Sequence, residues 1–198
     1  SEPLSPIMRA RSLSLRLDTL ALSTEKLRAA AKLVDGKLND AFVAGVAGGL
    51  RLYHEAHGSS PESLRMTMPI NVRDDATAKL AGNQFAPARF PVPIGIVDPL
   101  ERMRAIRNLV AEQRAEPALG LITDVSGVLN RLPASVTTSL FGSMLKGVDF
   151  VTSNVPGPRL DVYLSGARLE SVFGFGPLTG AALNVTLFSY TDGSHLGI

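Results

Sequence analysis

The chain has 198 residues, of which 45% are hydrophobic and 19% charged, with a formal net charge of +2. These values suit an ordinary globular protein with a substantial core, and a chain without a basic tract is a poor nucleic-acid binder. The absence of cysteine excludes disulfides and thiolate metal sites and fits a reducing compartment, so we expect a cytoplasmic protein.

The N-terminal region predicts a linker, a strand and a short helix. Residues 1–10 are typical of a linker, so we expect the chain to be a piece of a larger protein. Residues 11–20 alternate apolar and polar side chains, which predicts a half-buried strand. Ser23 or Thr24 is a suitable N-cap for a short helix that ends near residue 34.

A second, glycine-containing helix is predicted to start at Asn39, a preferred N-cap residue, with Asp40 favourable in its first turn. Gly45, Gly48 and Gly49 lie inside this helix, where each glycine costs about 1 kcal/mol relative to alanine. Three such glycines indicate the close approach of another backbone or of a ligand. Tight packing against a sheet is the explanation we favour.

Two histidines, His54 and His57, follow near the end of the same helix. They lie three residues apart without an acidic third ligand at metal spacing. We therefore expect solvated side chains rather than a metal site.

The middle of the chain predicts two strands and a third helix. Residues 64–70 alternate in the manner of a strand and lead into a polar loop at 71–75. A further extended stretch, 83–93, contains three prolines and is therefore expected at a sheet edge. The sequence Asp98-Pro99-Leu100-Glu101 is a strong helix start, and the arginines and glutamates of this helix are expected to face water.

Two apolar helical patterns follow Pro117, over residues 118–146. Their side chains are less polar than a surface helix requires. They either pack in the core, which we favour, or present an apolar face to lipid or substrate.

A proline-rich segment follows the apolar run 148–151. Two prolines around a glycine at 156–158 restrict the backbone, so the segment is expected to form a rigid loop that fixes Ser153 and Asn154 in place. Both an ordinary connection and part of a functional site fit this pattern.

The C-terminal region predicts further strands near residues 162–164, 167–175 and 181–190, a hairpin turn at 191–193 and a returning strand from His195. Strands and helices do not alternate strictly along the chain. The fold class is therefore α+β, or a layered α/β fold with a mixed sheet flanked by helices.

No complete catalytic motif is present in the sequence. The candidate polar residues are donors and positioners rather than bases: Asn39, Asp40, Arg73, Asn83, Ser153, Asn154, Asn184 and Thr186. The set indicates half of a site, with hydrogen-bond donors but without a general base.

Several short motifs, in their order and spacing, carry a resemblance to a known family. They are Asn39-Asp40, Met68-Pro69-Ile70-Asn71-Val72-Arg73, Gly82-Asn83, Asp98-Pro99-Leu100-Glu101-Arg102, Ser153-Asn154-Val155-Pro156-Gly157-Pro158, Leu164-Ser165-Gly166-Ala167-Arg168, Leu183-Asn184-Val185-Thr186 and Ser189-Tyr190. Together they resemble the C-terminal half of the bacterial wax ester synthase/diacylglycerol acyltransferase family. Asn71 stands where serine is common, and Leu38 where valine is common.

The resemblance implies one lobe of a two-lobed fold like that of chloramphenicol acetyltransferase. Residues 1–10 would then be the linker from a missing N-terminal lobe, and 11–198 the C-terminal acyltransferase lobe. In the family, the N-terminal lobe carries a His-His-x-x-x-Asp-Gly motif whose second histidine is the general base, and the site lies in a tunnel between the lobes. The present sequence contains no such motif.

The implied reaction is acyl transfer from acyl-CoA, a co-substrate, to diacylglycerol or a long-chain alcohol, with no cofactor. It needs a base for the acceptor hydroxyl and fixed donors for the oxyanion. We expect Asn39 to organise the reacting centre, with Asp40 beside it and Ser153 and Asn154 in second place. Arg73 is expected to meet either a CoA phosphate or a structural ion-pair partner.

Two alternatives remain open at this point: a non-catalytic lipid-binding or scaffold domain of the same fold, and transfer to a different alcohol such as a polyketide or sugar hydroxyl. Peripheral association with the inner membrane or with lipid droplets is a further expectation.

Overall fold

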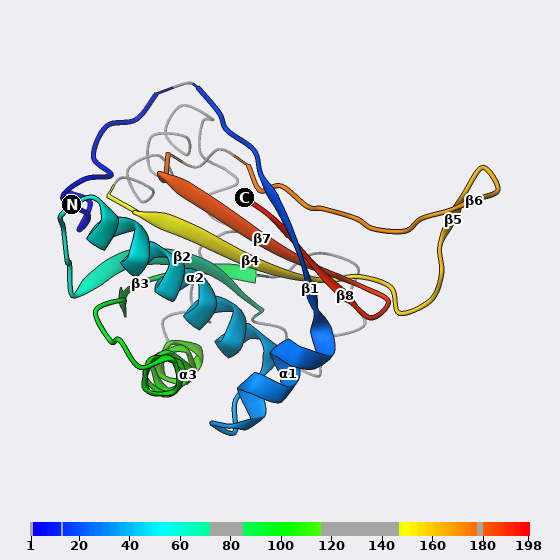
Figure 1. Ribbon diagram of the computed structural model, residues 1–198, viewed down its shortest axis with the longest axis horizontal. Helices are drawn as coiled ribbons and strands as arrows, with labels where there is room; N and C mark the ends of the chain where they lie inside the picture. Colours follow the sequence, from blue (N-terminus) through cyan, green and yellow to red (C-terminus); the bar gives the residue numbers. More distant parts are fainter. Residues whose placement is uncertain (1, 13, 72–84, 116–146, 178–179) are drawn as a thin grey trace, which may run out of the picture.

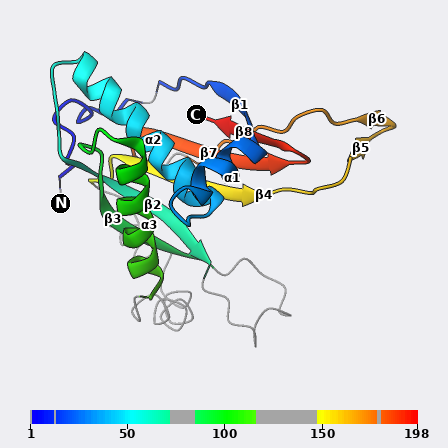
Figure 2. The same cartoon turned by 60° about the horizontal axis from the view of Figure 1, so that its bottom comes forward.

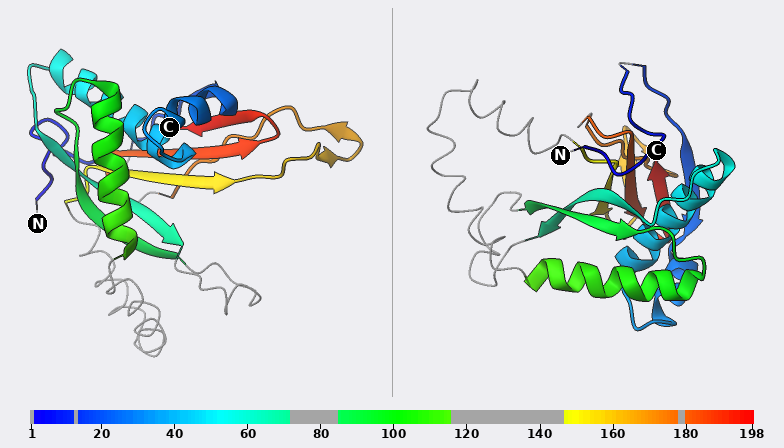
Figure 3. Two further views of the ribbon diagram at one scale, coloured as in Figure 1. Left: turned by 90° about the horizontal axis from the view of Figure 1, so that it is seen from below. Right: turned by 90° about the vertical axis from the view of Figure 1, so that its left-hand side faces the viewer.

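The computed structural model describes residues 2–12, 14–71, 85–115, 147–177 and 180–198. Within these residues, three helices pack on one side of a six-stranded mixed sheet, which confirms the expected fold class (Figures 1 and 3). Arg73, Asn83 and the helices expected over 118–146 lie outside the described residues.

The strand order of the sheet is β1-β8-β7-β4-β2-β3. The strands are β1 Thr19–Ser23, β2 Ser63–Asn71, β3 Phe85–Pro93, β4 Phe150–Pro156, β7 Leu183–Tyr190 and β8 Gly193–Gly197. β2, β4 and β7 run parallel, and the other neighbours pair antiparallel. The proline-bearing strand β3 lies at the edge as predicted, because proline cannot donate to a second neighbour.

The strand predicted over residues 11–20 was wrong in its bounds. β1 begins only at Thr19, which pairs with Gly197, and Leu15 and Leu17 are exposed. Asp18 and Ile198 exchange backbone hydrogen bonds of 2.9 Å in both directions just beyond this pair. The alternating side chains upstream have no described partner strand in this sheet, so their pattern does not produce a strand.

The helices are α1 Thr24–Lys32, α2 Leu38–Ala56 and α3 Pro99–Ala115. Two predicted caps are confirmed: the Ser23 side chain accepts from the Lys26 N–H at 3.2 Å, and Asp98 accepts from the Glu101 N–H at 2.8 Å. The prediction that Asn39 caps α2 was wrong, because the helix starts one residue earlier, at Leu38, after the N-cap residue Lys37.

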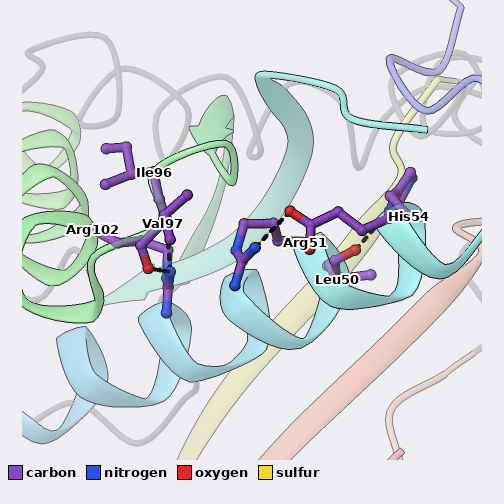
Figure 4. A network of polar contacts seen from close by, with 7 residues as sticks. Leu50, Arg51, His54, Ile96, Val97 and Arg102 are labelled. Atoms are coloured by element: carbon purple, nitrogen blue, oxygen red, sulfur yellow. Dashed lines mark hydrogen bonds and ion pairs between the residues drawn. The ribbon is translucent and has the colours of Figure 1, made fainter. Parts of the chain in front are cut away.

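Helices α2 and α3 contact each other through Arg102. The sequence pattern predicted that the arginines of α3 are exposed to solvent. Arg102 is 7% exposed, and its guanidinium donates to the carbonyls of Ile96 (2.7 Å) and Val97 (3.2 Å) (Figure 4). It also donates to the Ala44 carbonyl at 3.1 Å. A Cβ added at Gly48 would lie 2.6 Å from Arg102 Nη2. Gly48 therefore makes room for this side chain. Burial lowers the pKa of Arg102, and the charge of Arg51 lowers it further.

The expectation of a solvated His54 was also wrong, because a distant segment covers it. His54 is fully buried, with Nδ1 2.7 Å from the Leu50 carbonyl and Nε2 2.8 Å from Ser5 Oγ. Ser5 Oγ accepts from the N–H groups of Ile7 (3.3 Å) and Met8 (2.9 Å), so its own hydroxyl proton is free for His54 Nε2. His57 is exposed, as expected.

The N-terminal segment is held on the sheet by Asp149, a residue within the run predicted as apolar. The buried carboxylate accepts the N–H groups of Leu4 (3.1 Å), Ser5 (3.0 Å) and Arg65 (2.7 Å). Part of the expected linker therefore packs on the same sheet as the rest of the chain. The division at residue 10 remains a proposal.

A two-stranded arm, β5 Tyr163–Leu164 and β6 Ala167–Arg168, extends well beyond the sheet (Figures 1 and 2). The strand expected over 167–175 is thus limited to its first two residues. Tyr190 anchors the base of the arm, because its hydroxyl donates to the Leu169 carbonyl at 3.0 Å and accepts from the Val162 N–H at 2.9 Å.

Candidate functional site

The start of α2 lies beside the carboxyl ends of the three parallel strands. Asn39 contacts Met68, near the end of β2, and Leu38 lines a small pocket with Asn154 and Ser189 of β4 and β7. In open α/β sheets, ligands bind outside the carboxyl ends of parallel strands. This is the region in which the sequence-predicted polar residues can meet a substrate.

Asn39 is the second helical residue of α2 and is 9% exposed. Its Nδ2 donates to Met68 Sδ at 3.6 Å. A thioether is a weak acceptor, so this contact orients the amide without satisfying its donors strongly. The positive end of the helix dipole lies at the same place. The amide is thus suited to stabilising negative charge that develops nearby.

Asp40 fixes the helix start. Its Oδ2 accepts the Lys37 N–H at 2.7 Å, and the residue is buried. A carboxylate at the third helical position that binds the N-cap N–H is one half of a capping box. Asp40 therefore determines where α2 begins and, with it, where Asn39 points.

The expected rigid loop around Ser153 and Asn154 is instead strand: β4 continues to Pro156 and pairs with β7 over its whole length. Parallel pairing along the strand overrides the local turn signal. Because successive strand residues point to opposite faces, Ser153 and Asn154 are separated. Asn154 lies on the helix-covered face, in a pocket with Leu38, whereas Ser153 pairs with Thr186 on the opposite face.

The face that carries Ser153 is lined by further polar side chains of β7. Among the described residues, Thr186 Oγ1 and Asn184 Oδ1 are buried without a hydrogen-bond partner, while Asn184 Nδ2 donates to the Pro177 carbonyl at 3.1 Å. Cβ atoms built on Gly174 and Gly176 would lie within 3.2 Å and 2.3 Å of Thr186 and Asn184, respectively. The segment after the arm thus packs directly on this face.

Two arginines missed by the sequence reasoning, Arg28 and Arg159, line the small pocket that contains Asn154. The pocket encloses about 200 Å³ beside Leu38, at the start of α2. Guanidinium groups with a helix N-terminus form a favourable environment for an anion. No local motif signals this pair, because Arg28 belongs to α1 and Arg159 follows β4.

None of the three histidines is placed as a base for this region. His54 has both ring nitrogens bonded, and His57 is exposed, with Nδ1 2.8 Å from the Tyr53 carbonyl. His195 pairs with Phe188 on the face opposite the helices and packs edge-on against Phe173, with ring centroids 5.1 Å apart. The described residues hold no cluster of three or more potential metal ligands.

Comparison with known proteins identifies what this arrangement is similar to. The model of the WS/DGAT C-terminal domain matches residues 81–198. A Mycobacterium tuberculosis H37Rv protein named as a candidate diacylglycerol O-acyltransferase is 41% identical over 189 residues, 96% of this chain and 38% of the relative. A second such protein is 33% identical over 201 residues, 97% of this chain and 43% of the relative. The chain thus spans less than half the length of these relatives.

Solved structures agree on the fold. The wax ester synthase/diacylglycerol acyltransferase of Marinobacter aquaeolei VT8 matches 92% of this chain and 41% of its own, with a TM-score of 0.62 and 23% identity. A nonribosomal peptide synthetase matches 92% of this chain and 20% of its own, with a TM-score of 0.60 and 16% identity. At these identities the likeness concerns the fold alone.

Proposed function

Because the chain belongs to the wax ester synthase/diacylglycerol acyltransferase family, as its C-terminal domain, we propose that it forms one lobe of an acyl-CoA-dependent O-acyltransferase. The acceptor is diacylglycerol, a long-chain alcohol or both, giving triacylglycerol or wax ester. The single observation that carries this proposal is the buried amide of Asn39 at the start of α2, whose Nδ2 donates to a weak acceptor, Met68 Sδ.

In the proposed reaction, a histidine on the N-terminal lobe removes the proton of the acceptor hydroxyl. The alkoxide attacks the thioester carbonyl, and the tetrahedral intermediate expels CoA as a thiol when the proton returns. Asn39 donates to the oxyanion from the positive end of the helix dipole. Asp40 holds α2 in register, and it acts as a positioning residue.

Asn154 extends the proposed site along the helix-covered face, where it lies with Arg28 and Arg159. We assign the two arginines to a CoA phosphate, a role that the sequence suggested for Arg73. Ser153 lies on the opposite face of the same strand. We therefore propose that it helps to position β4 and does not contact the substrate.

The site is completed by an N-terminal partner lobe that carries the His-His-x-x-x-Asp-Gly motif. No described helix has the length and apolarity to cross a bilayer. We propose peripheral contact with a membrane or a lipid droplet, as the lipid substrates of the proposed reaction suggest.

A non-catalytic lipid-binding or scaffold role is the second candidate, and an apolar cavity on the helix-covered face favours it. Product formation separates the two functions. The complete protein, given radiolabelled palmitoyl-CoA with diacylglycerol or hexadecanol, is expected to form labelled neutral lipid, whereas the 198-residue chain alone forms none. Absence of product with every long-chain acceptor would favour the scaffold role.

A further inference from the structure

A large apolar cavity lies between α2 and the sheet, on the side of β1, β8 and β7. It encloses about 740 Å³, within the roughly 300–1,000 Å³ typical of small-molecule sites. Among the described residues, no charged side chain lines it, and its walls are mostly aliphatic, including Leu20, Val46, Leu183, Val185, Leu196 and Ile198. Leu20 and Tyr53 are each 48% exposed, so the cavity is partly open to solvent.

Two of the three glycines of α2 line this cavity. Gly45 and Gly49 are four residues apart and therefore lie on one face of the helix. Both glycines are exposed, at the open side of the cavity, and a Cβ added at either position would meet no described atom within 4 Å, in contrast to Gly48, which faces Arg102. Packing against a neighbour does not explain these two glycines. They leave open space, at a cost of about 1 kcal/mol each in helix stability.

The cavity is elongated along α2. Its lining positions run from Ala41 to Tyr53, about 18 Å at 1.5 Å per residue. One acyl chain occupies about half of the roughly 30 Å hydrocarbon core of a bilayer, or about 15 Å. Asn39 lies two residues before Ala41. A hydrocarbon chain laid along the helix would thus have one end near the proposed reacting centre.

We propose that this cavity binds the straight hydrocarbon chain of a lipid substrate along α2, with Gly45 and Gly49 providing the space and the reacting end directed towards Asn39. The assignment rests on the proposed function. An uncharged slot of this length suits methylene groups and excludes the phosphates of CoA. The bound hydrocarbon chain belongs either to acyl-CoA or to the acceptor, and both substrates carry a run of methylene groups.

A graded series at one position tests the assignment: Gly49→Ala, Gly49→Leu and Gly49→Phe in the complete protein, with Gly45→Leu as a second site. Chain-length profiles are measured with varied acyl-CoA at fixed acceptor, and then with varied alcohol at fixed acyl-CoA. In the wild type, kcat/KM for the bound chain rises by up to about fourfold per methylene until the slot is filled. Gly49→Leu lowers kcat/KM for the long chain at least about tenfold and leaves the short chain nearly unchanged. The substrate whose chain-length profile changes, acyl-CoA or alcohol, is the one whose hydrocarbon chain occupies the cavity.

Glu55→Leu is the matched control, because it places the same side chain on α2 at a position outside the cavity lining. The Glu55 side chain is 42% exposed, and its ion pair with Arg51 (2.6 Å), whose side chain is 18% exposed, reaches the surface, so we expect its loss to cost little. Both profiles should stay as in the wild type. Unchanged chain-length profiles in Gly49→Leu and Gly49→Phe overturn the inference. This holds also if these variants weaken binding of the partner lobe.

Direct binding separates this inference from the proposed function. If the complete protein transfers no acyl group, palmitate and hexadecanol are titrated against the 198-residue chain. Binding that Gly49→Phe reduces at least about tenfold, and that Glu55→Leu leaves intact, supports the cavity assignment alone. Equal binding by wild type and Gly49→Phe overturns it.

Discussion

At the residue scale, two neighbouring polar side chains at the start of α2 have different tasks. Asn39 retains donor capacity beside Met68, whereas the Asp40 carboxylate binds the Lys37 N–H. The amide faces a weak acceptor and the carboxylate a strong donor. Substitutions at the two positions should therefore separate catalysis from stability.

Replacing Asn39 with alanine in the complete protein is expected to lower kcat by about 10²–10³, the range for loss of an oxyanion donor. The free energy of unfolding should change by about 1 kcal/mol or less, because only a weak hydrogen bond is lost. Steady-state kinetics and urea unfolding measure the two effects. Asn39→Asp, which keeps the shape but removes the donor, should be equally inactive, and a near-normal rate in either variant would exclude Asn39 from the site.

Asp40→Asn should show the opposite balance. Loss of the charge at the helix N-terminus and of the strong acceptor for Lys37 is expected to destabilise the chain by about 1 kcal/mol. The remaining folded protein should keep kcat within about tenfold of the wild type, because Asp40 acts only through the placement of Asn39. A loss of kcat as large as that of Asn39→Ala, at unchanged stability, would instead make Asp40 a catalytic residue.

Residue types and spacing point to Asn39 and Asp40 as candidate site residues, but they do not predict the geometry of either side chain. Asn39 is an intrinsically good N-cap, yet the capping interaction of Asp40 with Lys37 shifts the helix start. The burial of His54 depends on Ser5, 49 residues away, which no local pattern reveals. Arg28 and Arg159 likewise meet only through the fold.

At the element scale, α2 contains glycines with opposite structural reasons. Gly48 lets the guanidinium of Arg102 approach, and Gly45 and Gly49 border open space. The sequence led us to expect the close approach of a backbone or a ligand, or packing against a sheet, at all three glycines. At Gly48 the approaching group is instead the Arg102 side chain of α3, and Gly45 and Gly49 meet no described atom within 4 Å. The helix sequence looks the same in both cases. The difference depends on what lies next to each glycine, which is α3 at Gly48 and the cavity beside β7 and β8 at Gly45 and Gly49.

Alanine at these three positions should therefore change stability with different signs. Gly45→Ala and Gly49→Ala are expected to raise the free energy of unfolding by about 0.5–1 kcal/mol each, through helix propensity alone. Gly48→Ala should lower it by about 1–3 kcal/mol, because the new Cβ overlaps a guanidinium held by three carbonyls. Chemical denaturation of the three single variants checks the signs, and a stabilising Gly48→Ala would refute this account of α2.

A second element-scale prediction concerns the N-terminal segment. Asp149→Asn should cost about 3 kcal/mol, because the amide offers one acceptor oxygen to the N–H groups of Leu4, Ser5 and Arg65. Urea unfolding and limited proteolysis near residues 4–8 measure the loss. Asp192→Asn, at an exposed hairpin position, serves as the control and should change neither. Unaltered protease resistance in Asp149→Asn would show that other contacts hold the segment.

Strands were predicted well where alternation and turn residues agree, as in β2, β7 and the β7–β8 hairpin. Strand bounds were predicted wrongly where pairing with a distant strand determines them. Residues 11–18 alternate without a described partner strand, and β4 continues past Ser153 and Asn154 to Pro156, where the proline-glycine signal begins, because β7 pairs with it along its full length. Pairing is a long-range property, and local propensity is only a weak guide to it.

At the scale of the whole molecule, the arm formed by β5 and β6 leaves apolar side chains uncovered. Leu160, Tyr163 and Leu164 are each more than 60% exposed, and the arm projects away from the sheet (Figure 2). Uncovered apolar groups on a projecting element indicate a surface that a partner buries. The chain spans less than half of its relatives, and we propose that the N-terminal lobe of the proposed enzyme covers this surface.

The double variant Tyr163→Ser, Leu164→Ser should weaken association with a separately produced N-terminal lobe by about tenfold or more, because two exposed apolar anchors are lost. Its own unfolding midpoint should stay close to that of the wild type, since neither side chain is buried in this chain. Isothermal titration calorimetry measures the affinity. If the double variant binds the N-terminal lobe with wild-type affinity, the lobe does not contact this surface.

We propose that this chain supplies the donor half of a shared acyl-transfer site. The most direct test of this claim measures ester formation from labelled palmitoyl-CoA by the chain alone, by the N-terminal lobe alone and by their mixture, with wild-type and Asn39→Ala chains. We predict product only in the mixture, reduced about 10²–10³-fold by Asn39→Ala. Turnover by the 198-residue chain alone, or equal turnover by wild-type and Asn39→Ala mixtures, would contradict the claim.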